Sequence, residues 1–191
     1  MTDNSRETRI NDFARVAVRI EREAGIPAPF LLAQWAVESA WGEKCTGAFN
    51  YWGITYNPNL HPTFKWCATR EVLSQRQVDR LDPEEKRDLR VTNVLASGKM
   101  EVRLKRRFAA FPSAEEGLRS YVRLLLGKTT YRIAVDKYTT QPKTTEALNT
   151  FIEEIARAGY ATDPEYANLL KGIASQANVT RALAQARAEL K

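Results

Sequence analysis

The sequence predicts an α+β fold that is mainly helical, with a small β-hairpin lobe inserted after the second helix. Apolar residues recur at helical spacing in the first 42 residues and again after residue 113, whereas the intervening pattern changes towards that of strands. The length of 191 residues and the hydrophobic content of 43% are sufficient for one domain with its own core. We therefore expect a single domain over 1–191, with the β-lobe at about 65–111.

Two helices are expected before the lobe. Ile10, Phe13 and Ile20 lie at helical spacing within 8–24, and a glycine follows at a position suited to end that helix. A second helix is predicted over 29–41, because a proline suits its first turn and a glycine follows it. The second helix is apolar nearly all round, so we expect it to be buried in the middle of the domain.

The strands of the lobe are predicted from alternating polar and apolar residues, and the later helices from residues typical of helix caps. Residues 43–64 have an irregular pattern, and the three strands expected after them cover 65–73, 91–96 and 99–108, with a short charged helix at 82–87. Ser113 and Glu116 form a capping box that begins the next helix. The remaining helices are expected at about 130–138, at 145–158, after the cap Thr162-Asp163-Pro164, and at 180–190.

The composition excludes several kinds of chemistry. The chain contains one histidine, His61, so zinc sites with two or more histidines are ruled out, and we expect neither a metal nor a cofactor. A Ser-His-Asp or Cys-His mechanism would depend on His61 alone. That residue lies among the turn-forming residues 57–62, which we expect to form an exposed loop. Carboxylates and tyrosines are therefore the expected catalytic groups.

The chain is basic, with 29 Lys and Arg against 23 Asp and Glu and a net charge of +6. Such a surface favours nucleic acid, anionic lipid or the acidic polymers of a bacterial wall, and ordinary solvated charge explains it equally well. The densest basic run, 103–107, lies inside an alternating strand, so no nucleic-acid partner is expected.

The first residues lack the apolar core of a secretory signal, and no stretch is suited to membrane insertion. Cys45 and Cys67 either form one bridge or stay free, and the sequence favours free thiols because nothing indicates an oxidising compartment.

Glu38 is the only charged residue between Glu23 and Glu43, on a helix predicted to be buried. Gln34 and Trp41 lie on the same helix face, one turn to either side. An apolar setting raises the pKa of a carboxyl group, and a raised pKa is what a general acid needs near neutral pH. The alternative is a structural glutamate that pairs with a buried arginine or caps a loop.

Half of the aromatic residues, including all four tryptophans, lie between Phe30 and Trp66. Three of them, Tyr51, Trp52 and Tyr56, fall in the irregular region, where flat rings suit the apolar faces of sugars. A lone acid on a buried helix, an aromatic loop and a hairpin lobe together suggest glycoside hydrolysis.

Segment 33–42 (AQWAVESAWG) resembles the signature "AQ…ES.WG" of glycoside hydrolase family 73, the peptidoglycan-cleaving β-N-acetylglucosaminidases of the lysozyme-like superfamily. Further blocks at 50–55 (NYWGIT), 108–113 (FAAFPS), 121–125 (YVRLL) and 159–167 (GYATDPEYA) are similar to family blocks in the same order. The resemblance covers roughly 10–175. It implies a lysozyme-like fold and cleavage of the β-1,4 bond between N-acetylglucosamine and N-acetylmuramic acid.

The resemblance also implies roles for single residues. Glu38 matches the general acid and Tyr160 matches an active-site tyrosine. The family takes a second carboxylate from the hairpin lobe in the context "T-x-E", which matches Glu71 here, with Glu101 as the alternative. Substrate-binding positions are expected at Gln34, Asn50, Tyr51, Trp52, Tyr131 and Tyr166. Trp52 and Thr55 depart from the usual Phe and Lys, which is expected to alter contacts with the sugar more than the chemistry.

The expected partner is the glycan strand of peptidoglycan, bound by a monomer. Two alternatives stay open: a lytic transglycosylase, whose usual "G-L-M-Q" block is absent, and a non-catalytic glycan-binding module. The expected place of action is the cell wall or periplasm, which a chain without a signal peptide would reach by phage lysis or specialised secretion, or from a longer precursor.

Overall fold

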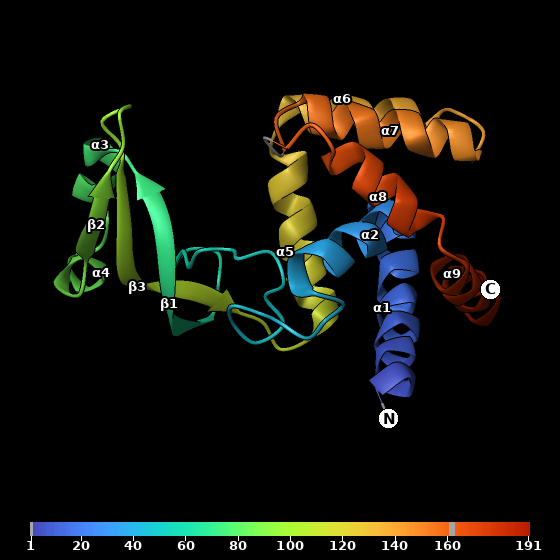
Figure 1. The fold of residues 1–191 in the computed structure, drawn as a ribbon. Coiled ribbons are helices and arrows are strands. Elements are labelled where there is room, and N and C mark those ends of the chain that lie inside the picture. The colour runs from blue at the N-terminus through green and yellow to red at the C-terminus, as the bar shows by residue number, and fades with distance from the viewer. Residues whose placement is uncertain (1, 161–162) are drawn as a thin grey trace.

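The computed structural model describes residues 2–160 and 163–191, with side chains from Ser5 onwards. It is mainly helical, and the sheet lobe stands to one side of the helices (Figure 1). The helices are α1 (Thr2–Ala24), α2 (Ala28–Ser39), α3 (Gln75–Asp79), α4 (Pro83–Arg87), α5 (Ala114–Leu126), α6 (Thr129–Thr139), α7 (Thr145–Arg157), α8 (Tyr166–Ala174) and α9 (Ala177–Glu189). The predicted α+β class and the lobe after the second helix are confirmed.

Helix α2 lies at the centre of the helical part, in contact with α1, α8 and α9. Nine of its twelve residues are buried, which confirms the burial predicted from its all-round apolar character. The Trp35 ring stacks on Phe13 of α1 at a centroid distance of 4.4 Å, and Phe30 meets Phe151 of α7 edge-on. Burial of each such ring stabilises the fold by about 1.5–3 kcal/mol, so α2 is fixed rigidly.

The end of α2 differs from the prediction. The helix ends at Ser39 rather than Trp41, because Ala40, Trp41 and Gly42 have left-handed φ angles of 49°, 61° and 80°. Trp41 therefore does not lie on the helix face of Glu38, and its ring lies 4.0 Å below the Arg6 guanidinium. Ala40 and Trp41 are strained in this sparsely populated region, whereas Gly42 adopts it freely, and such strain is common next to functional sites.

Within the described residues, the sheet has three antiparallel strands in the order β1 (Thr63–Leu73), β3 (Met100–Ala110) and β2 (Arg90–Val94). The predicted strands are confirmed, with ends that shift by up to two residues. Helix α3 was not predicted, although its signal was present: Ser74 and Gln77 form a complete capping box.

The two faces of the sheet have different surroundings. One face, called here the covered face, packs Leu73, Val102 and Leu104 against Leu81 in a small apolar cluster. Because side chains alternate along a strand, Cys67, Thr69, Glu71 and Leu73 share the covered face. The other face, called the open face, carries Phe64, Trp66, Ala68 and Arg70 from β1 and Arg103, Lys105 and Arg107 from β3.

The lobe is joined to the helices by the loop 40–62. The backbone N–H of Ala109 donates to the Ile54 carbonyl at 2.9 Å, and that of Phe111 donates to the Ala48 carbonyl at 2.8 Å. On the covered face, the Cys67 thiol contacts the Thr46 carbonyl. The base of the covered face therefore meets the loop that directly follows α2.

Cys45 and Cys67 are free thiols in the structure, as the sequence favoured. In the described part of the chain, none of the helices combines the length and the apolar character needed to cross a bilayer.

Candidate active site

Glu38 lies in the last turn of α2, one turn after Gln34, which is completely buried. The Glu38 side chain is exposed, yet the protein around it removes enough water to raise the pKa of its carboxyl group. Among the described residues, no cation lies within ion-pair distance of Glu38. The alternative of a glutamate paired with a buried arginine is therefore not supported.

A hydrogen-bonded group of tyrosines, called here the tyrosine cluster, lies next to Glu38. The Gln34 side-chain amide donates to the Tyr166 hydroxyl at 3.2 Å, and its oxygen accepts from Tyr121. The hydroxyl groups of Tyr121 and Tyr160 are 2.8 Å apart, and the Tyr160 ring stacks on Tyr166 at 5.5 Å. Gln34 therefore acts as a positioning residue that holds Tyr121 and Tyr166 directly and Tyr160 through Tyr121.

Glu38 and the tyrosine cluster influence each other electrostatically. Burial raises the pKa values of the Tyr121, Tyr160 and Tyr166 hydroxyl groups far above the usual value for tyrosine. The negative charge of Glu38 raises each of these pKa values further. These hydroxyl groups therefore stay protonated at any physiological pH. Neutral hydroxyls beside a carboxyl can hold a sugar oxygen or a water molecule by hydrogen bonds.

A cavity of about 440 Å³ opens beside this cluster. Its aromatic wall comes from Trp52, Tyr121, Tyr131 and Tyr160. Trp52 stacks on Tyr121 at 4.5 Å with an interplanar angle of 4°. Flat, mostly apolar walls with a few polar groups are typical of sugar-binding clefts. The structure thus brings Trp52 and Tyr131, two of the residues expected to contact substrate, into the wall of one cavity.

Two expected substrate contacts are placed elsewhere. Asn50 has no exposed surface, and its amide group bonds to the backbone of Ile54 and Ala109 at 2.8–2.9 Å. It therefore anchors the loop to the lobe, and its burial counts against direct contact with substrate. Tyr51 packs edge-on against Phe13 and Trp35 at 6.1 Å, on the side of α1, and does not line the aromatic cavity.

His61 is a clear correction. The sequence predicts an exposed loop, but His61 is only 7% exposed. Its Nδ1 accepts from the Asn57 backbone N–H at 3.0 Å, and its Nε2 lies 3.4 Å from the Ser120 hydroxyl. Burial lowers the pKa of the imidazole, so the ring is neutral and serves to fix the loop against α5.

Glu71 lies on β1, on the covered face of the sheet. Its carboxylate accepts from the Thr69 hydroxyl at 3.3 Å and lies 3.6 Å from the Arg106 guanidinium. Glu71 shares its face with Cys67, which contacts the loop after α2, whereas Glu101 pairs with Val72 on the open face. The structure does not bring Glu71 into contact with Glu38. Both faces of the sheet meet the loop 40–62, the covered face through Cys67 and the open face through Phe64, so the structure does not choose between Glu71 and Glu101.

Sequence reasoning missed Tyr121 as a site residue. Tyr121 is only 4% exposed, and its contacts with Gln34, Tyr160 and Trp52 make it the centre of the tyrosine cluster. Tyr121 could have been identified because it begins the segment 121–125, which resembles a block of the family. Ala161 and Thr162, which belong to the predicted final block and cap, lie outside the described residues.

We expect Tyr160→Phe to lower the hydrolytic rate by about tenfold or more, because the hydroxyl group beside Glu38 is lost while the ring stays. Loss of its bond to Tyr121 should cost no more than about 1 kcal/mol of unfolding free energy. Steady-state kinetics and thermal melting check the two effects. Tyr138→Phe is the matched control, since Tyr138 is also buried but packs on Phe151 outside the cluster. A fully active Tyr160→Phe protein would contradict the expected role.

A helical domain that carries a carboxyl group next to a tyrosine cluster, with an aromatic cavity beside that cluster and a sheet lobe to one side, is the arrangement of lysozyme-like glycoside hydrolases. The sequence model of the glucosaminidase family (mannosyl-glycoprotein endo-beta-N-acetylglucosaminidase) matches residues 14–179. The chain therefore belongs to this family of glycoside hydrolases, family 73, and the resemblance seen in the sequence is confirmed.

Known relatives agree with this classification. The chain is 28% identical over 177 residues to the peptidoglycan hydrolase FlgJ of Pseudomonas aeruginosa, in an alignment that covers 90% of this chain and 36% of that protein. The chain thus spans about a third of the length of this curated relative.

Two solved structures share the fold. The glycoside hydrolase domain of FlgJ from Salmonella typhimurium matches with a TM-score of 0.61 and 23% identity, over 100% of this chain and 95% of that one. The catalytic domain of the autolysin Auto from Listeria monocytogenes matches with a TM-score of 0.63 and 22% identity, over 95% and 89% of the two chains. At these identities the likeness shows the fold alone.

Proposed function

We propose that the protein hydrolyses the β-1,4 bond between N-acetylglucosamine and N-acetylmuramic acid in peptidoglycan, with Glu38 as general acid. The observation that carries the proposal is the Glu38 carboxyl group, whose pKa is raised and which lies beside a cluster of protonated tyrosines. The names of the relatives, peptidoglycan hydrolases among them, support the choice of substrate.

In the proposed reaction, Glu38 gives its proton to the glycosidic oxygen as the bond after N-acetylglucosamine breaks. Tyr160 and Tyr166 hold a sugar oxygen or the attacking water, and Trp52 supports a sugar ring. Glu71 is the proposed second carboxylate, which stabilises the positive charge that develops on the sugar or activates water. The proposed site of action is the cell wall or periplasm, and the proposed active form is a monomer.

The pH dependence of the rate should follow the protonation of Glu38. A general acid works only while protonated, so kcat/KM should fall as pH rises through the pKa of Glu38. Because desolvation raises that pKa, the alkaline limb should lie above the ordinary value for glutamate of about 4.3. A pH profile of kcat/KM on solubilised glycan strands measures the limb. A rate that keeps rising through neutral pH would contradict the assignment.

Digestion of purified peptidoglycan, followed by borohydride reduction and mass spectrometry of the fragments, tests the proposed bond. The proposal predicts fragments that end in reduced N-acetylglucosamine. Anhydro-muramyl ends would instead identify a lytic transglycosylase, and reduced muramic acid ends a hydrolase of the other glycosidic bond. Intact polymer would indicate a protein that binds glycan without cleaving it.

A further inference from the structure

The open face of the lobe carries a row of arginines across all three strands. Arg70 of β1 and Arg90 of β2 are both register partners of Arg103 on β3. All three side chains are exposed. Among the residues that the structure describes, none of the three has an ion-pair or hydrogen-bond partner. Like charges directly opposite on neighbouring strands destabilise a sheet, and no ion pair among the described residues offsets the cost of this row.

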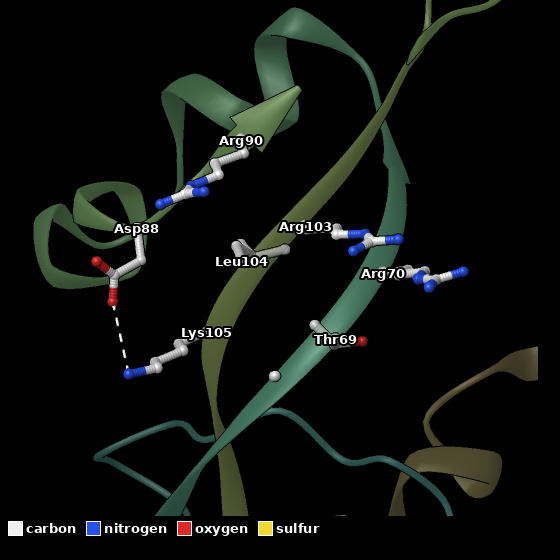
Figure 2. Close-up of a pocket in the computed structure, with 8 residues that line it drawn as sticks. Thr69, Arg70, Asp88, Arg90, Arg103, Leu104 and Lys105 are labelled. Atoms are coloured by element: carbon white, nitrogen blue, oxygen red, sulfur yellow. Dashed lines mark ion pairs between the residues drawn. The ribbon is translucent and has the colours of Figure 1, made fainter. Parts of the chain in front are cut away.

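The arginines surround a hollow of about 550 Å³. Ala68 contributes to its wall, and Lys105 completes the basic rim. Figure 2 shows the side chains of Arg70 and Arg103 extending in the same direction, whereas Arg90 extends to the side of Asp88 and Lys105. The ion pair between Asp88 and Lys105, at 3.8 Å, involves the one acidic residue of the rim. Arg70 and Arg103 are the two arginines that point to one side and can bind an anion together.

A line of aromatic rings connects this hollow to the cleft of the active site. His61 of the cleft wall lies 6.3 Å from the Tyr56 ring, which lies 4.7 Å from Phe64. Phe64 meets Trp66 edge-on at 6.0 Å, and Trp66 is 42% exposed. Ala68 follows Trp66 on the same face, about 7 Å further along the strand. A glycan that follows the rings from the cleft would therefore reach the hollow.

We propose that this hollow binds the carboxylate groups of the peptide stems that branch from the glycan. Arginine guanidinium groups bind carboxylates with two parallel hydrogen bonds, which a row of arginines can provide to successive acidic groups. In peptidoglycan each muramic acid carries a peptide with several free carboxylates, so a sugar near Trp66 places its peptide beside Arg70 and Arg103. The inference rests on the proposed function for its choice of polymer.

Binding to two forms of one polymer tests the proposal. The probes are glycan strands with their peptide stems and the same strands after an amidase has removed the stems. The protein carries Glu38→Gln so that neither polymer is consumed. We expect about tenfold tighter binding to the peptide-bearing strands at low salt, and loss of this preference in 0.5 M salt, about the concentration at which exposed charges are screened.

The double variant Arg70→Gln/Arg103→Gln should lose the preference, and Arg70→Lys/Arg103→Lys should keep part of it. The matched control is Arg132→Gln/Arg181→Gln, which removes the same charge from exposed positions on α6 and α9 and should keep the preference. Thermal melting verifies that each variant is folded. If the glutamine variant does not fold, the preference for peptide-bearing strands is compared between the lysine variant and the parent protein, and a weaker preference in the lysine variant supports the proposal.

Equal binding of the two polymers by the parent protein, or a preference that survives in the glutamine variant, would overturn the proposal. Tighter binding to polyglycerol phosphate than to peptide-bearing strands would overturn the choice of carboxylate. The proposed function is tested separately, by release of reducing ends from stem-free strands by the protein with Glu38 intact. If no reducing ends are released, the comparison of binding to the two polymers remains valid. If the two polymers bind equally, the test of hydrolysis remains valid.

Discussion

Glu38→Gln should abolish nearly all activity on peptidoglycan while leaving the fold unchanged. The amide has almost the shape of the carboxyl group but cannot give a proton to the glycosidic oxygen, and the loss of a general acid typically costs about 10²–10⁴-fold in rate. The side chain is exposed and has no ion pair among the described residues, so its replacement breaks no stabilising contact that the structure records. Release of soluble fragments per unit time measures the effect.

The control for this variant is Glu43→Gln, an exposed glutamate five residues further along that pairs with Arg9 at 3.0 Å. An exposed pair of this kind contributes at most about 1 kcal/mol, so Glu43→Gln should stay active and folded. If Glu38→Gln keeps more than about a tenth of the parent rate, Glu38 is not the general acid.

Glu71→Gln should lower kcat by about 10²-fold or more and change KM much less, since the second carboxylate acts on charge or water in the transition state rather than on bound substrate. The substitution also removes the charge that faces Arg106 at 3.6 Å. Arg106 keeps Glu85 as a second partner at 3.8 Å, so the stability of the lobe should change little. Steady-state kinetics on solubilised strands separate kcat from KM.

Glu101→Gln is the matched comparison, because Glu101 lies on the same sheet but on the open face. We expect its kinetic effect to be much smaller than that of Glu71→Gln. If Glu101→Gln lowers kcat more than Glu71→Gln does, the match of Glu71 to the family's "T-x-E" context is wrong and the second carboxylate is Glu101 on β3.

The sequence predicts the fold well where local pattern determines structure. Helical periodicity and all-round apolar character predict α2 and its burial, and the alternation of polar and apolar residues predicts β1 and β3. The end of α2 could not be predicted, because left-handed residues such as Ala40 and Trp41 are held by the surrounding structure. One of these contacts is the Arg9 side chain, which donates to the Trp41 carbonyl at 2.8 Å.

The site is predictable only in part, since long-range packing decides which polar groups meet. Glu38 stands out in the sequence as a lone charge on an apolar helix. The tyrosine cluster joins residues 34, 121, 160 and 166, which no local pattern connects. Asn50 and His61 lie in loop-like sequence and look accessible, but the lobe and α5 bury them.

The central claim is that Glu38 drives hydrolysis of the bond that follows N-acetylglucosamine. Digestion of peptidoglycan in water enriched in the heavy oxygen isotope tests this most directly, with the parent protein and Glu38→Gln compared by mass spectrometry. We predict one heavy oxygen atom on each new N-acetylglucosamine reducing end with the parent protein, and no new ends with Glu38→Gln. Unlabelled anhydro-muramyl ends, or labelled ends produced equally by both proteins, would contradict the account.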